Sequence, residues 1–88
     1  MYRTYKVCEV LWNLNGDFQT EYCATFTSLK KAQKYVKDHE KDWENDLDDV
    51  EVGIGVEIET WEREKKSQDN SFDDLVDSYT AWCKDKVR

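Results

Sequence analysis

Residues 50–62 read VEVGIGVEIETWE, and this stretch decides the fold. Apolar side chains alternate there with polar residues or glycine, the apolar ones being Val50, Val52, Ile54, Val56 and Ile58. Alternation with a period of two is typical of a β-strand that buries one face. We therefore predict a strand over residues 50–62. Its outer face carries Gly53, Gly55 and Trp61, where the glycines either admit a close neighbouring element or open a flat surface for a partner.

Two further strands are expected upstream, over residues 4–12 and 18–27, which are rich in β-branched and aromatic residues. Asn15-Gly16 lies between them and is a strong hairpin signal. A two-residue turn would place Glu9 on the apolar face, whereas a three-residue loop ending at a left-handed Gly16 keeps it off that face. Because burying an unpaired carboxylate costs more than a bulge, we favour the three-residue loop. This register gathers one apolar face from Cys8, Val10, Trp12, Phe18, Tyr22, Ala24 and Phe26.

Apolar residues spaced by three and four predict a helix over residues 28–46, which Thr27 or Ser28 would cap. Its stripe consists of Leu29, Ala32, Val36, His39 and Trp43, and Leu47 extends it. A similar spacing predicts a second helix over residues 71–86, with Ser71 as its cap. The stripe of that helix consists of Phe72, Leu75, Val76, Tyr79, Trp82 and Cys83.

The expected fold class is α+β in the order ββαβα, a small antiparallel three-stranded sheet with two helices packed against it. The 88 residues form one domain, in which residues 65–71 are a polar connector. The chain has no apolar run of ~18 residues and no signal-peptide core at its start, so we expect a cytoplasmic protein without a membrane segment. Three cysteines without metal-binding spacing indicate free thiols in a reducing compartment.

Charge is distributed unevenly along the chain. Twelve of the 27 residues from 38 to 64 are carboxylates. Residues 38–77 hold 16 acids and four bases, a net charge of −12, whereas the remaining residues hold four acids and nine bases, a net charge of +5. Such a distribution concerns the choice of partners and the solubility of a protein rather than its fold.

The sequence shows no motif of an enzyme or a cofactor site. His39 is the one histidine and falls on the helix stripe, where a structural role is expected rather than a catalytic one. The acidic run that begins at Asp42 invites comparison with a calcium loop. Read from Asp42 or from Asp46, it lacks the glycine that an EF-hand needs at its sixth position. We therefore expect no enzymatic activity, no metal and no cofactor.

The carboxylates of the first predicted helix are unfavourably placed. Asp42, Glu44 and Asp46 lie in its C-terminal half, where they oppose the helix dipole, and like charges four residues apart destabilise a helix by ~0.2–0.5 kcal/mol per pair. Solubility alone does not require this arrangement, so it favours an electropositive partner over a merely solvated acidic face. The predicted partner-binding residues are Asp42, Glu44, Asp46, Asp48, Asp49, Glu57, Glu59 and Trp61.

In size, acidity, aromatic content and lack of a catalytic motif, the chain resembles the small inhibitors that phages carry against host nucleic-acid enzymes, such as anti-CRISPR, anti-restriction and uracil-DNA glycosylase inhibitors. The resemblance is one of general character over the whole chain and assigns no residue. It implies a DNA-mimicking inhibitor in the host cytoplasm that binds a basic nucleic-acid-binding protein, a CRISPR effector or other nuclease, and does not touch nucleic acid itself. The alternative is a protein-interaction module or homodimer that uses the strand face of Gly53, Gly55 and Trp61.

Overall fold

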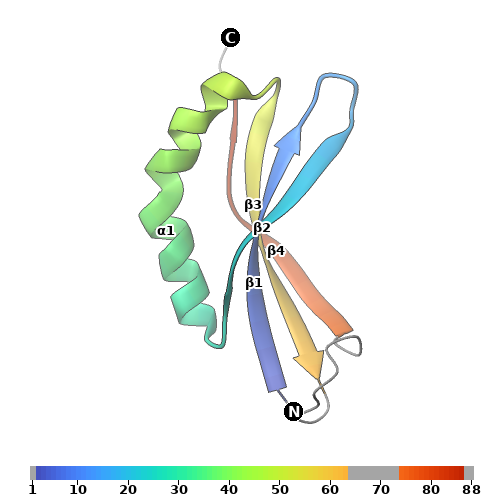
Figure 1. The fold of residues 1–88 in the computed structure, drawn as a ribbon, viewed down its shortest axis with the longest axis vertical. Coiled ribbons are helices and arrows are strands. Elements are labelled where there is room, and N and C mark those ends of the chain that lie inside the picture. The colour runs from blue at the N-terminus through green and yellow to red at the C-terminus, as the bar shows by residue number, and fades with distance from the viewer. Residues whose placement is uncertain (1, 64–73, 87–88) are drawn as a thin grey trace.

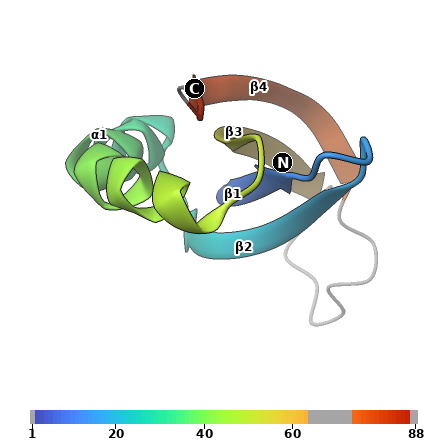
Figure 2. The ribbon, with the colours of Figure 1, turned by 90° about the horizontal axis from the view of Figure 1, so that it is seen from above.

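A computed structural model describes residues 2–63 and 74–86. In chain order its elements are β1 (Tyr2–Trp12), β2 (Phe18–Phe26), α1 (Leu29–Asp46), the 3-10 turn η1 (Leu47–Asp49), β3 (Gly53–Arg63) and β4 (Asp74–Asp85). The strands form one antiparallel sheet in the spatial order β2-β1-β3-β4, and α1 lies along one face of it (Figure 1). Seen from above, β1 and β3 lie at the centre, and β2 and β4 form the two edges (Figure 2).

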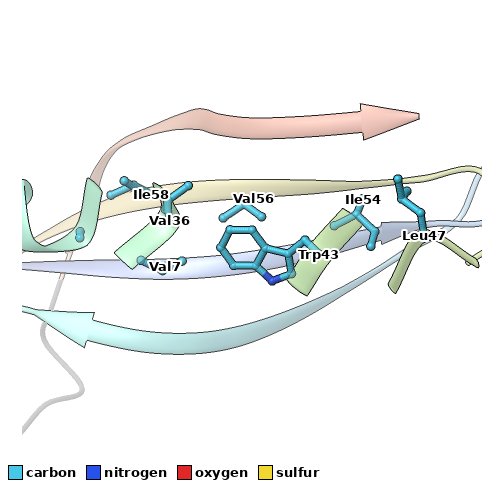
Figure 3. Close-up of a cluster of buried hydrophobic side chains, with 8 residues drawn as sticks. Val7, Val36, Trp43, Leu47, Ile54, Val56 and Ile58 are labelled. Carbon is cyan, nitrogen blue, oxygen red and sulfur yellow. The ribbon is translucent and has the colours of Figure 1, made fainter. Parts of the chain in front are cut away.

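The core lies between α1 and the central strands (Figure 3). β3 turns alternate residues toward α1, and α1 turns its apolar stripe toward β3, as the two sequence periods predict. The buried cluster consists of Val7, Ala32, Val36, Trp43, Leu47, Ile54, Val56 and Ile58. Burying a large apolar side chain contributes ~1.5–3 kcal/mol, so this layer is the main source of stability. The three predicted strands and the first predicted helix are confirmed, with ends shifted by three residues at most.

The loop between β1 and β2 has the predicted three-residue form. The Asn13 N–H donates to the Asp17 carbonyl at 2.9 Å, and Gly16 is left-handed with a φ of 89°. The register that follows is also the predicted one, running from Trp12 opposite Phe18 to Cys8 opposite Tyr22.

A bulge in β2 then changes which residues share a face. Cys23 has no partner on β1, and beyond it Ala24 lies opposite Val7 instead of continuing the earlier register. A slip of one residue moves the following side chains to the other face of the sheet. The prediction that Ala24 and Phe26 share a face with Phe18 is therefore wrong, because both join the face of Val7, which α1 covers.

The C-terminal segment is the strand β4, so the predicted helix over residues 71–86 is wrong. Two bulges in its pairing with β3 explain the misleading spacing. Ala81 is the extra residue at one of them, so Tyr79 and Trp82, three apart, both turn toward α1. Val76 is the extra residue at the other. Strand residues with such steps imitate the three-residue spacing of a helix.

Pairing with β3 decides the structure of this segment. The β-branched and aromatic residues of this segment favour a strand. In addition, β4 forms hydrogen bonds with the backbone N–H and C=O groups on the edge of β3, which would otherwise be unpaired. The fold is thus α+β, but the predicted three-stranded sheet with two helices is wrong, because the described residues form four strands and one α-helix. The predicted connector and the predicted cap Ser71 with Phe72 lie outside the described residues. Within residues 2–63 and 74–86, no helix combines the length and apolar character that crossing a membrane requires.

Candidate protein-binding surface

α1 presents its carboxylates on two flanks rather than on one face. Trp43 points into the core. Because successive residues are rotated by ~100° around a helix axis, its neighbours Asp42 and Glu44 project to opposite sides of the helix. Glu44 lies on the side of β4, where the Lys84 Nζ is 3.7 Å from its Oε1. Asp46 lies on the other side, close enough to Glu9 of β1 to raise the pKa of that carboxyl. The helix therefore separates acids that are adjacent in the sequence.

The side of α1 that faces β2 gathers four carboxylates, called the acidic flank below: Glu9, Glu21, Asp42 and Asp46. Asp42 lies near Glu9 there, because both, after burial and Cys23, raise the pKa of Tyr35. Glu9 and Glu21 are direct cross-strand partners. Glu9 is half-buried beside the helix, and its burial, followed by Asp46 and Glu21, raises its pKa. Among the described residues, none of the four has a lysine or arginine nitrogen within ion-pair distance. The acidic flank thus holds like charges that no cation of the described part of the chain pairs with.

The side of α1 that faces β4 differs because lysines reach it. Besides the Lys84–Glu44 pair, the Lys86 Nζ donates to the carbonyls of Asp48 and Val50, at 3.4 and 3.0 Å. The side chains of Asp48 and Asp49 are exposed on η1. Positive charge from Lys84 and Lys86 therefore offsets part of the negative charge at this end, whereas no lysine or arginine in residues 2–63 and 74–86 does so at the acidic flank.

The remaining predicted residues lie on the face of the sheet away from α1. Glu57 and Glu59 are half-buried there, and the Trp61 Nε1–H donates to Glu59 at 3.1 Å. The Lys6 Nζ lies 4.5 Å from the centre of the Trp61 ring. The structure accordingly places the eight predicted residues in two groups: five on α1 and η1, and three on the opposite side of the sheet.

Sequence reasoning missed Glu9 and Glu21 as members of the acidic surface. The signal was present, because the favoured hairpin register already pairs these two residues across the strands. The register keeps Glu9 off the face of Cys8 and Val10, as intended. However, α1 covers the other face of the sheet, and Glu9 lies on that covered face. Which face a helix covers depends on the whole sheet and not on the hairpin alone.

The two glycines of β3 have different environments. A Cβ on Gly53 would lie 2.8 Å from the Lys84 carbonyl oxygen, so this glycine permits the close approach of β4. A Cβ on Gly55 would meet only the Trp12 Nε1, at 3.8 Å. Gly53 thus serves the packing of the sheet, and Gly55 leaves open space on the face away from α1.

His39 and the cysteines have structural environments. The His39 Nδ1 lies 2.8 Å from the Tyr35 carbonyl oxygen, and the two rings stack with centres 4.0 Å apart. Burial, followed by Glu59 and Glu57, raises the pKa of Cys8 to about 11, which disfavours the reactive thiolate. Cys23 is half-buried and Cys83 exposed, and all three are unpaired. In the described part of the chain, no three His, Cys, Asp or Glu residues are placed to share a metal ion.

Comparison with protein-family models, curated proteins and solved structures finds no match for this chain. The fold and surfaces define a small α+β domain with a charged helix side and an aromatic sheet face. The functional argument therefore rests on the chemistry of these surfaces.

Proposed function

We propose that the protein is an inhibitor that binds a basic nucleic-acid-binding protein and covers the surface that would otherwise hold DNA or RNA. The partner is a nucleic-acid enzyme of a host cell, of the class of CRISPR effectors and other nucleases, and binding takes place in the host cytoplasm. The observation that supports this proposal is the acidic flank, where four carboxylates gather without a cation from the described residues.

The acidic flank is unfavourable in the free protein. Like charges opposite each other on neighbouring strands destabilise a sheet, by ~0.2–1 kcal/mol for a pair such as Glu9 and Glu21. Burial of Glu9 adds to this cost by disfavouring its charged form. A lysine or arginine of a partner would supply the missing positive charge and lower the pKa of Glu9 again. Binding is therefore favoured at a pH where Glu9 is charged.

The end of α1 strengthens the negative field. The last helical turn contains no basic residue, and a helix C-terminus itself carries a partial negative charge of ~0.5 elementary charge. Asp42 and Asp46 are four residues apart, which places them ~6 Å apart along the helix axis. A strand of a nucleic-acid duplex carries one phosphate per ~3.4 Å of its axis. The helix thus offers a row of negative charges on a rigid element, which a groove lined with lysine and arginine attracts.

A protein partner is favoured over nucleic acid on electrostatic grounds. The chain has a net charge of −7, and most of its negative charge lies in the segment that supplies α1, η1 and β3. Phosphate groups are repelled by such a surface. A basic protein surface is attracted, with association that is fastest at low ionic strength.

The test is displacement of a labelled DNA duplex from purified enzymes: a CRISPR effector nuclease, a restriction endonuclease and a uracil-DNA glycosylase. The wild-type protein should compete with DNA for at least one of them. The double variant D42N/D46N should lose at least ten-fold in potency, or ~1.4 kcal/mol. The control D74N/D77N removes the same charge from exposed residues of β4 and should retain potency. Displacement from none of the enzymes, or equal loss in both variants, would contradict the proposal.

A further inference from the structure

The face of the sheet away from α1 carries a groove of about 370 Å³ that the proposed function does not use. β1 and β2 contribute Trp12 and Phe18 to it, β3 contributes Gly55 and Glu57, and β4 contributes Asp85. The groove thus crosses the sheet from one edge strand to the other. It combines aromatic rings with carboxylates over a glycine.

The aromatic side of the groove is formed by Trp12 and Phe18. Their ring centres lie 5.2 Å apart, and the two residues are 42% and 58% exposed. Two neighbouring aromatic rings with this much exposure offer aromatic surface to a group that enters the groove. Gly55 beside them has no side chain, so the space next to the Trp12 ring stays open.

The opposite side of the groove is acidic. Glu57 is half-buried and Asp85 is exposed, and both lie on the face of Gly55 because the pairing of β3 with β4 sets Asp85 opposite Gly53. The described residues that line the groove include no lysine or arginine. Aromatic faces and carboxylates both attract a cation, so the groove has the composition of a site for a positively charged side chain.

A similar combination of aromatic rings and a carboxylate surrounds one of the protein's own lysines elsewhere on this face. The Lys6 Nζ lies 4.5 Å from the centre of the Trp61 ring and 5.7 Å from that of Tyr22. Lys6 is also the cross-strand neighbour of Glu59. This face of the sheet thus already places one cation beside aromatic rings and a glutamate.

We propose that the groove binds an arginine side chain of a protein partner. A guanidinium group is planar, stacks on aromatic rings and donates to carboxylates through a fork of N–H groups. Trp12 and Asp85 flank Gly53 on its two neighbouring strands, so a guanidinium that stacks on the Trp12 ring can donate to Asp85 across this glycine. Phe18 and Glu57 add a second ring and a second negative charge to the same groove. The groove lies on the opposite face of the sheet from α1, so this inference does not depend on the acidic flank.

The test is an NMR titration of ¹⁵N-labelled protein with the peptide acetyl-Gly-Arg-Gly-amide. The Trp12 indole N–H signal should shift, because this nitrogen lies beside Gly55, and both residues line the groove. The matched peptide with citrulline has the same shape without the charge and should bind at least five-fold more weakly. The peptide with lysine should also bind more weakly, because it lacks the planar fork.

Variants separate this groove from the acidic flank. D85N should weaken arginine-peptide binding at least three-fold, and G55V, which fills the groove, should abolish the Trp12 shift. D77N is the control on the same strand but the other face, and D42N/D46N is the control on α1; both should bind as the wild type does. The proposal is overturned by equal affinity for the arginine, lysine and citrulline peptides, or by a folded D85N that binds unchanged. Shifts confined to α1 would also overturn it while supporting the acidic flank.

Discussion

Replacing Glu9 by glutamine is expected to raise the thermal stability of the protein at neutral pH. Burial, Asp46 and Glu21 raise the pKa of Glu9 in the folded state above its ordinary value of 4.5. The folded state therefore binds more protons than the unfolded state between these two pKa values, and stability falls as the pH rises through that window. Above that window the full cost is present. Glutamine removes it together with the like-charge pair that Glu9 forms with Glu21.

The expected gain follows from the cross-strand pair. Relieving one like-charge pair is worth ~0.2–1 kcal/mol, and ~1 kcal/mol corresponds to ~4–8 °C in a domain of this size. Thermal melting by circular dichroism should therefore show a higher Tm for E9Q at pH 7, and the difference should shrink below pH 4.5, where both states of the wild type are protonated. E62Q is the control, because it removes the partner of Arg3 and should lower the Tm or leave it unchanged. A lower Tm for E9Q at pH 7, or a pH-independent difference, would refute this reasoning.

Three further predictions concern the fold and the thiols. W43A removes the buried indole between α1 and the sheet and should lower the free energy of unfolding by ~3–5 kcal/mol in urea titrations, so a loss below ~1 kcal/mol would contradict the described core. G53A should destabilise the protein by ~1–3 kcal/mol because its Cβ meets the β4 backbone, whereas G55A should be neutral or stabilising, and the reverse order would show that β4 is misplaced. In native alkylation followed by mass spectrometry, the exposed Cys83 should react well before the buried Cys8, whose raised pKa of about 11 disfavours the thiolate; a faster Cys8 would contradict its burial.

Local patterns were sufficient for the parts of the fold in which one period continues without interruption. The alternation in residues 50–62 and the helical stripe around Val36 each report a single buried face, and both elements form where they were predicted. The left-handed Gly16 likewise fixed the hairpin register. These signals depend on short-range geometry, which a single sequence contains.

The errors arise where a bulge or a distant partner decides the structure. The bulges at Val76 and Ala81 convert a period of two into steps of three, and β3, the partner that makes this segment a strand, is the preceding element of the chain rather than part of the segment itself. The bulge at Cys23 moves Ala24 to the opposite face in the same way. The candidate site shows the same limit. The acids on α1 were predicted from their spacing, but Glu9 lies beside them only because the helix packs against β1 and β2.

The central claim is that the carboxylates of the acidic flank attract a basic partner, and the salt dependence of association tests it most directly. The association rate constant of the protein with the enzyme that it displaces from DNA is measured by stopped flow across a series of salt concentrations, for the wild type and for D42K/D46K. Both aspartates are exposed, so the variant should keep the wild-type Tm or exceed it. The wild type should associate faster as salt falls, and the variant should lose this dependence and bind at least ten-fold more slowly. Association of the wild type that is independent of salt, or a variant that melts early yet binds at the wild-type rate, would contradict the account.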